Sequence, residues 1–171
     1  VNRRDAERRR LRTGAVRVAL TGYTNAGKTS LMNALCGTGL TAVDRPFETL
    51  DTTTRCLTRH GGDVLLSDTV GFIRRLPDRL FASFQSTLAE VTEASMLLLV
   101  LDVSDPEVSE HLRVINSVLE RLGATHLPRL VVFNKLDRLR TAPPAGQLAA
   151  LAGPHKYVCV SAHDPHTVEV L

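Results

Sequence analysis

Eight residues near the start of the sequence have the types and the spacing of a phosphate-binding loop. Residues 22–29 read Gly-Tyr-Thr-Asn-Ala-Gly-Lys-Thr, which fits the pattern G-x-x-x-x-G-K-[ST]. Glycines let such a backbone point successive N–H groups at one spot, and the dipole of a following helix favours an anion there. We expect Lys28 to reach the β- and γ-phosphates of a nucleotide and the hydroxyl of Thr29 to bind Mg²⁺. The other residues that we expect to contact the nucleotide phosphates are Asn25, Ala26, Gly27 and Ser30.

A second motif, D-x-x-G at residues 68–71, predicts the metal-binding side of the same site. The Asp68 carboxylate at the end of a strand can hold a Mg²⁺-bound water, and the backbone N–H of Gly71 can meet the γ-phosphate. Loss of that phosphate would release the segment, as in nucleotide-dependent switches. In the triphosphate state one upstream threonine should also reach Mg²⁺ and the γ-phosphate, and the residues leave three candidates open: Thr52, Thr53 and Thr54.

The N-K-x-D sequence of residues 134–137 predicts which base is bound. Guanine presents two adjacent donors, its ring N–H and its exocyclic amine, and these match the two oxygens of the Asp137 carboxylate. Adenine does not present this pair and would leave the carboxylate unpaired, a mismatch worth a factor of about 10⁴. We expect Asn134 and Lys135 to brace the surrounding loops and to pack on the base plane. Two backbone N–H groups would complete the base pocket, those of Ser161 and Ala162.

Alternating apolar and amphipathic segments would bring these motifs to one edge of a sheet. Strands are predicted at residues 16–21, 64–68, 96–103, 130–133 and 156–160, and helices at 28–36, 78–91, 104–122 and 145–151. Gly61-Gly62 predicts a hairpin turn after a strand at 55–60, whereas the polar residues 38–54 predict an irregular loop. The expected fold is α/β, with a mostly parallel six-stranded sheet, one antiparallel edge strand and helices on both faces. In such sheets ligands bind at the carboxyl ends of the strands.

Composition excludes several classes of protein. The chain has 171 residues, enough for one domain with its own core, and its three cysteines are far apart, as expected for reduced thiols in the cytoplasm. We expect no signal peptide and no membrane span, because the longest apolar run covers only residues 96–101.

The positive charge is concentrated at the start of the sequence. The net charge is +3, and residues 1–12 carry six arginines against two acidic residues. This arm could touch phosphate-rich RNA, or it could be the solvated end of an upstream helix.

Several of these segments together resemble the HflX GTPases of the bacterial Obg-HflX group. The resemblance rests on the phosphate loop at 22–29, on Phe-Glu-Thr-Leu-Asp-Thr-Thr-Thr-Arg at 47–55 and above all on Asp-Thr-Val-Gly-Phe-Ile-Arg-Arg-Leu-Pro at 68–77. The sequence S-F-x-x-T-L-x-E at 83–90 follows the same pattern. The resemblance implies a three-layer P-loop GTPase domain that binds GTP or GDP with Mg²⁺. It further implies a cytoplasmic enzyme that binds the large ribosomal subunit and acts in ribosome splitting or rescue under stress, and we expect a monomer.

The resemblance, which covers residues 14 to about 163, also divides the chain. We expect residues 1–13 to be a basic arm or the end of a linker helix, and residues 14–171 to be the GTPase domain without its last helix. The ribosome-binding domain that the family carries at its N-terminus would be absent apart from the arm. This segment alone should therefore bind guanine nucleotides but bind ribosomes weakly.

Matching this sequence to the family assigns further roles. The family's usual loop reads Phe-Ala-Thr-Leu-Asp-Pro-Thr, which makes Thr53 the metal-binding threonine, together with Thr29 and Asp68. Phe72 stands where Ras-like GTPases carry a water-orienting glutamine, so hydrolysis should be slow without a partner or an extra cation. In related GTPases an asparagine at the position of Asn25 binds K⁺, and here it could do so or simply brace the loop. The residues expected to act in hydrolysis are Asn25, Lys28, Thr53 and Gly71. Thr29 departs from the family's serine, Glu48 from its alanine, Thr52 from its proline and Arg75 from a common acidic residue.

Two other functions stay open on the sequence alone. The chain could be a module that senses the ratio of GTP to GDP, or guanosine tetraphosphate, with little intrinsic hydrolysis, because Phe72 cannot orient water. It could also be an ATP-using enzyme, if the role of Asp137 is misread. A metal site at Cys159, His163 and His166 is not expected, since the cysteine would lie in a strand and the histidines in a loop.

Overall fold

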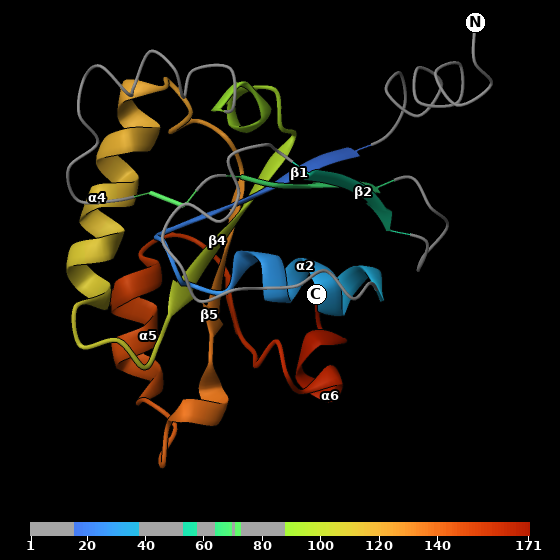
Figure 1. Cartoon of the computed structure of the whole chain (residues 1–171). Coiled ribbons are helices and arrows are strands. Elements are labelled where there is room, and N and C mark those ends of the chain that lie inside the picture. Colours follow the sequence, from blue (N-terminus) through green and yellow to red (C-terminus); the bar gives the residue numbers. More distant parts are fainter. Residues whose placement is uncertain (1–15, 38–52, 58–63, 70, 73–87) are drawn as a thin grey trace, which may run out of the picture.

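Six strands form a single sheet at the centre of the computed structural model, in which residues 16–37, 53–57, 64–69, 71–72 and 88–171 are described (Figure 1). The strand order is β2-β3-β1-β4-β5-β6. The strands span Val16–Gly22 (β1), Thr53–Leu57 (β2), Val64–Asp68 (β3), Met96–Asp102 (β4), Arg129–Asn134 (β5) and Tyr157–Cys159 (β6). Strand β2 pairs antiparallel with β3, and the other strand pairs of this sheet are parallel. The structure thus confirms the predicted α/β fold with one antiparallel edge strand.

Helices lie on both faces of this sheet. The helices whose full length is described are α2 (Lys28–Cys36), α4 (Val108–Arg121), the 3₁₀ turn η2 (Leu136–Arg138), α5 (Ala145–Ala152) and α6 (Pro165–Val168). In Figure 1, α4 and α5 stand together on one side of the sheet, and α2 and α6 stand on the other. Because parallel strands need crossover connections, helices cover both faces and the fold has three layers.

The central strand β4 is apolar on both faces because helices cover both. Leu97, Leu99 and Leu101 are at most 1 % exposed and pack in the core shared with α4 and α5. Leu98 and Val100 alternate with them and pack in a second core, shared with α2 and α6. Successive side chains of a strand point to opposite faces, so a strand buried on both sides reads as a continuous apolar run.

Helix α4 buries the apolar stripe that the sequence predicts, but it starts later than expected. Ile115 is fully buried, and Leu112 packs against the same core. The helix begins at Val108 and not at residue 104. Before it, the Asp105 carboxylate accepts the backbone N–H of Glu107 at 2.8 Å, which closes a separate turn.

Strand β2 starts two residues earlier than predicted. The expectation that residues 38–54 form a loop is wrong for Thr53 and Thr54, which belong to β2. Thr54 lies opposite Ser67 in the antiparallel pair, and their hydroxyl oxygens are 2.9 Å apart. β-Branched residues with a cross-strand partner suit a pleated strand, and this pairing outweighs the polar character on which the loop was predicted.

The two histidines near the C-terminal end differ in their local structure. His163 lies in a turn, as expected, but His166 belongs to α6 and not to a loop. The Asp164 carboxylate accepts the backbone N–H of His166 at 3.1 Å, and Pro165 occupies the first position of the helix. An acceptor followed by proline is a helix start, which explains this correction.

Some predictions fall outside the described residues: the arm at 1–13, Thr52, the Gly61-Gly62 turn and most of the helix at 78–91. The end of that helix is described, since residues 88–92 are helical and Leu88 and Val91 are buried. In the part of the chain that the structure describes, each helix is too short or too polar to cross a membrane.

Candidate nucleotide-binding site

The predicted motifs meet at the edge of the sheet where the parallel strands end. Strand β1 runs into the phosphate loop, whereas β3 ends at Asp68, β4 at Asp102 and β5 at Asn134. The register sets Leu20 level with Asp68, and Asp102 level with Asn134, so the carboxyl ends lie side by side. This is the edge at which open α/β sheets bind ligands.

Two residues of the phosphate loop have a left-handed backbone conformation. Asn25 has a φ of 61° and Gly27 a φ of 92°, and Ala26 between them is buried. Gly27 is also required by space, because a Cβ there would lie 2.3 Å from the side-chain nitrogen of Asn134. Helix α2 follows directly, with Ser30 in its first turn. The first N–H groups of a helix have no carbonyl partner within it, so the loop ends in donors suited to an anion.

The side chain of Lys28 is folded into this loop. It is 7 % exposed, and its Nζ donates to the carbonyl oxygens of Tyr23 at 3.1 Å and Gly22 at 3.4 Å. Burial lowers the pKa of Lys28 from 10.5 to about 8, although the Asp68 carboxylate acts in the opposite direction. Burial therefore disfavours the charged form of the ammonium group, and a bound anion would favour it.

Thr29 and Asp68 lie together on the metal-binding side of the predicted site. The hydroxyl of Thr29 donates to Oδ2 of Asp68 at 2.6 Å, and Asp68 is 1 % exposed. Thr53 is the residue opposite Asp68 in β2. Hydroxyl and carboxylate oxygens are the hard donors that Mg²⁺ prefers, so Thr29 and Asp68 fit this ion. The role of Thr53 at the metal stays a prediction.

Gly71 and Phe72 lie against the start of the phosphate loop. The N–H of Phe72 donates to the carbonyl of Gly22 at 3.0 Å, and the N–H of Thr24 donates to the carbonyl of Phe72 at 2.9 Å. A Cβ at Gly71 would lie 2.8 Å from the Cα of Thr24 and 3.0 Å from the Nζ of Lys28. The Phe72 ring is 5 % exposed and belongs to the core, so it forms part of the scaffold of the site.

Asn134 joins the base-binding segments to the phosphate loop. Its side-chain nitrogen donates to the carbonyl of Ala26 at 2.9 Å, and its side-chain oxygen accepts the backbone N–H of Ala162 at 3.0 Å. The residue is 1 % exposed. One buried amide thus connects three segments that are distant in the sequence.

Lys135 makes a second connection, through a residue that sequence reasoning missed. Its Nζ donates to the carbonyl of Asn25 at 2.5 Å and forms an ion pair with Oδ2 of Asp102 at 2.7 Å. The other oxygen of Asp102 accepts the backbone N–H of Ser104 at 3.0 Å. Asp102 lies within the strand predicted at residues 96–103, and the sequence alone assigned it no role in the site. Its position at the end of β4, beside the strand that leads to Lys135, is the signal that could have revealed the pair.

Asp137 is exposed at η2 and is held by Ser161. The hydroxyl of Ser161 donates to Oδ1 of Asp137 at 2.6 Å, and this hydrogen bond lowers the pKa of Asp137. The predicted backbone donors are engaged within the protein, since the N–H of Ser161 donates to Thr167 Oγ1 at 2.8 Å and that of Ala162 to Asn134. Their contact with a base stays a prediction. Asp137 itself is an ionised acceptor at neutral pH.

Replacing Asn134 with alanine should lower the free energy of unfolding by roughly 2–4 kcal/mol, because it leaves the Ala26 carbonyl and the Ala162 N–H without their partner. Urea unfolding of the nucleotide-free chain measures this change. Asn116→Ala is the matched control, since Asn116 is exposed on α4 and should alter stability by less than about 0.5 kcal/mol. Equal stability of the two variants would show that Asn134 does not hold these segments together.

Comparison with known proteins points to one family. The family described as "50S ribosome-binding GTPase" matches residues 17–135. The chain is 49 % identical over 173 residues to a GTPase HflX of Gluconacetobacter diazotrophicus, covering 100 % of this chain and 38 % of that protein. It is 52 % identical over 136 residues to a GTPase HflX of Spirochaeta thermophila, covering 79 % of this chain and 33 % of that protein. The chain thus spans less than two fifths of the length of these relatives.

A solved structure agrees with the sequence comparison. The crystal structure of a GTP-binding protein from the archaeon Sulfolobus solfataricus in complex with GDP has a TM-score of 0.68 and 27 % identity, covering 93 % of this chain and 50 % of that chain. The chain therefore belongs to the 50S ribosome-binding GTPase family, as a GTPase domain of the HflX type.

Proposed function

We propose that the chain binds guanine nucleotides, hydrolyses GTP to GDP and phosphate, and acts on the large ribosomal subunit in ribosome splitting or rescue under stress. The observation that carries this proposal is that Lys28, the Thr29–Asp68 pair and Asp137 share one edge of the sheet. The family to which the chain belongs supports the ribosomal part. A cytoplasmic location and a monomeric state belong to the same proposal.

In the proposed complex the phosphates lie in the loop at residues 22–29. Lys28 supplies positive charge there, and the first N–H groups of α2 and that of Gly71 donate hydrogen bonds. Thr29, Asp68 and Thr53 would hold Mg²⁺, which neutralises charge on the β- and γ-phosphate oxygens when it is bound. Asp137 would accept the ring N–H and the amine of guanine, and Ser161 keeps this carboxylate ionised and in place.

Hydrolysis in this site should be slow in the isolated chain. Phe72 is buried in the core, and its ring could not orient an attacking water from any position. Asn25 is exposed at the rim of the loop, and Lys135 holds its carbonyl. A K⁺ ion bound by Asn25 would place positive charge beside the phosphates, where charge develops in the transition state.

Rates of GTP hydrolysis, measured in K⁺ and in Na⁺ with and without large ribosomal subunits, test this proposal. Subunits are added at high concentration, so that their affinity for the chain does not limit the rate. We expect faster turnover with subunits and in K⁺, and an Asn25→Ala variant should lose the preference for K⁺ while keeping its affinity for GDP. Flat rates near zero under all four conditions would favour the alternative, a guanine-nucleotide sensing module.

The affinity for GDP should fall about tenfold between pH 7 and pH 9. Lys28 has a pKa of about 8 without nucleotide, and bound phosphates would raise that pKa, so binding above pH 8 requires uptake of a proton. Dissociation constants measured across this range, with the proton uptake from calorimetry in buffers of different ionisation enthalpy, check the effect. Lys28→Arg is the control, since arginine stays charged across this pH range. Its affinity for GDP should fall only slightly towards pH 9, because the ring N–H of guanine begins to lose its proton there. An equal pH profile for both proteins would contradict the role of Lys28.

A further inference from the structure

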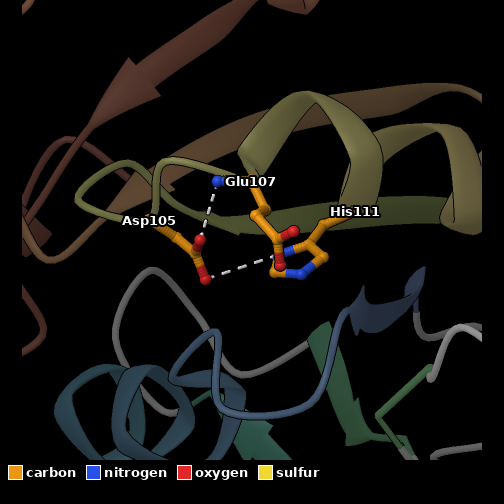
Figure 2. Close-up of side chains that lie close together, drawn as sticks. All are labelled: Asp105, Glu107 and His111. Atoms are coloured by element: carbon orange, nitrogen blue, oxygen red, sulfur yellow. Dashed lines mark hydrogen bonds and ion pairs between the residues drawn. The ribbon is translucent and has the colours of Figure 1, made fainter.

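Three side chains of the kinds that bind metal ions meet where β4 leads into α4. They are Asp105, Glu107 and His111, and their ligand atoms all lie within 4.8 Å of one another. Figure 2 shows the two carboxylates and the imidazole on the same side of the helix start. None of them is among the residues assigned above to the nucleotide or to Mg²⁺.

A helical turn and a side-chain-to-backbone hydrogen bond place these three side chains together. Glu107 stands immediately before α4 and His111 four residues later, and residues at this spacing share one face of a helix. The N–H of His111 donates to the carbonyl of Glu107 at 3.0 Å, so the helical turn between them is closed. Asp105 uses Oδ1 to accept the N–H of Glu107, which leaves Oδ2 directed at the imidazole.

The spacing of the ligand atoms suits a shared ion better than a direct hydrogen bond. Nδ1 of His111 and Oδ2 of Asp105 are 3.6 Å apart, which is too long for a hydrogen bond. Two ligands at about 2.1 Å from a tetrahedral Zn²⁺ ion lie about 3.4 Å from each other. The observed distance between Nδ1 of His111 and Oδ2 of Asp105 is close to this ligand-to-ligand distance.

The imidazole is held in position from its other side. Its ring stacks on Tyr23 of the phosphate loop, with the ring centroids 3.7 Å apart and an angle of 10° between the planes. The side chain of His111 is only 12 % exposed. A cavity of about 30 Å³, lined in part by Asp105, His111 and Tyr23, adjoins the cluster and has room for an ion with a bound water.

We propose that Asp105, Glu107 and His111 bind one divalent transition-metal ion, with the properties of Zn²⁺, at the start of α4. A nitrogen ligand distinguishes this site from the oxygen ligands of Thr29 and Asp68, since imidazole favours transition metals and Mg²⁺ favours oxygen. The two carboxylates balance the charge of the ion, and a water completes four-coordination. The site lies beside the phosphate loop, because His111 stacks on Tyr23.

Titration of the 171-residue chain with Zn²⁺, in the presence of excess Mg²⁺ and GDP, tests the site by calorimetry. We expect one ion to bind with a dissociation constant on the order of micromolar. His111→Gln and Glu107→Gln should each weaken binding at least about tenfold, since even the loss of a residue that only orients a ligand typically costs about 10–100-fold in metal affinity. His126→Gln is the matched control, because His126 is exposed beyond the other end of α4 and should leave the affinity unchanged.

Co²⁺ provides a second readout, because tetrahedral Co²⁺ absorbs visible light more strongly than octahedral Co²⁺. We expect the wild-type chain and His126→Gln to show the stronger absorption, and Glu107→Gln to lose it. Glu107 is exposed, so that variant should fold even if loss of the His111 ring disturbs the stack on Tyr23. If all four proteins bind Zn²⁺ equally, or if the wild-type chain binds none at millimolar concentration, the proposed site does not exist.

Discussion

Replacing Asp137 with asparagine should weaken the binding of GDP by about 10³-fold and improve the binding of xanthosine diphosphate. The carboxylate, which Ser161 keeps ionised, offers two acceptors to the two donors of guanine. Asparagine offers one acceptor and one donor, which match the ring N–H and the carbonyl of xanthine. A site built for hydrogen bonds rejects an analogue that leaves them unmade by a factor of this size.

Competition against fluorescent GDP measures both affinities in the variant. Asp164→Asn is the matched control, because it makes the same chemical change at the start of α6, where the carboxylate accepts the backbone N–H of His166. It should leave the affinity for GDP within about twofold of that of the wild-type chain. Unchanged GDP binding by Asp137→Asn would mean that this carboxylate does not contact the base.

Replacing Lys28 with alanine should lower the affinity for GDP by about two orders of magnitude or more. The buried ammonium group lies in the centre of the phosphate loop, and each hydrogen bond to a charged phosphate contributes about 1.5–3 kcal/mol. Lys156→Ala, an exposed lysine just before β6, removes the same charge without touching the loop. Equilibrium binding of labelled GDP to both variants gives the comparison, and similar affinities would place the phosphates elsewhere.

The sequence predicted the motifs and most of the strands and helices around them, because these features depend on local chemistry. Residues close together in the chain determine the glycine-containing phosphate loop, the apolar strand β4 and the end of α2 at Cys36. The structure agrees with each of these predictions. The strand at Thr53 and Thr54 was missed because its stability comes from pairing with β3, a partner that a local pattern does not reveal.

The contacts within the site were harder to predict than its motifs. The ion pair of Lys135 with Asp102 and the stack of His111 on Tyr23 join segments that are distant in the sequence. Such contacts depend on how β4, β5 and α4 are placed relative to the phosphate loop, and spacing along the chain does not contain that information. The late start of α4 is a local effect, in which the Asp105 side chain competed with the helical backbone.

Displacement of labelled GDP from the Mg²⁺-containing chain by GTP and by ATP tests the central claim most directly. The site described here predicts that GTP displaces GDP at similar concentrations, whereas ATP requires a concentration about 10³-fold higher or does not compete. Displacement by ATP at the same concentration as GTP would contradict guanine recognition by Asp137, and with it the proposed GTPase function.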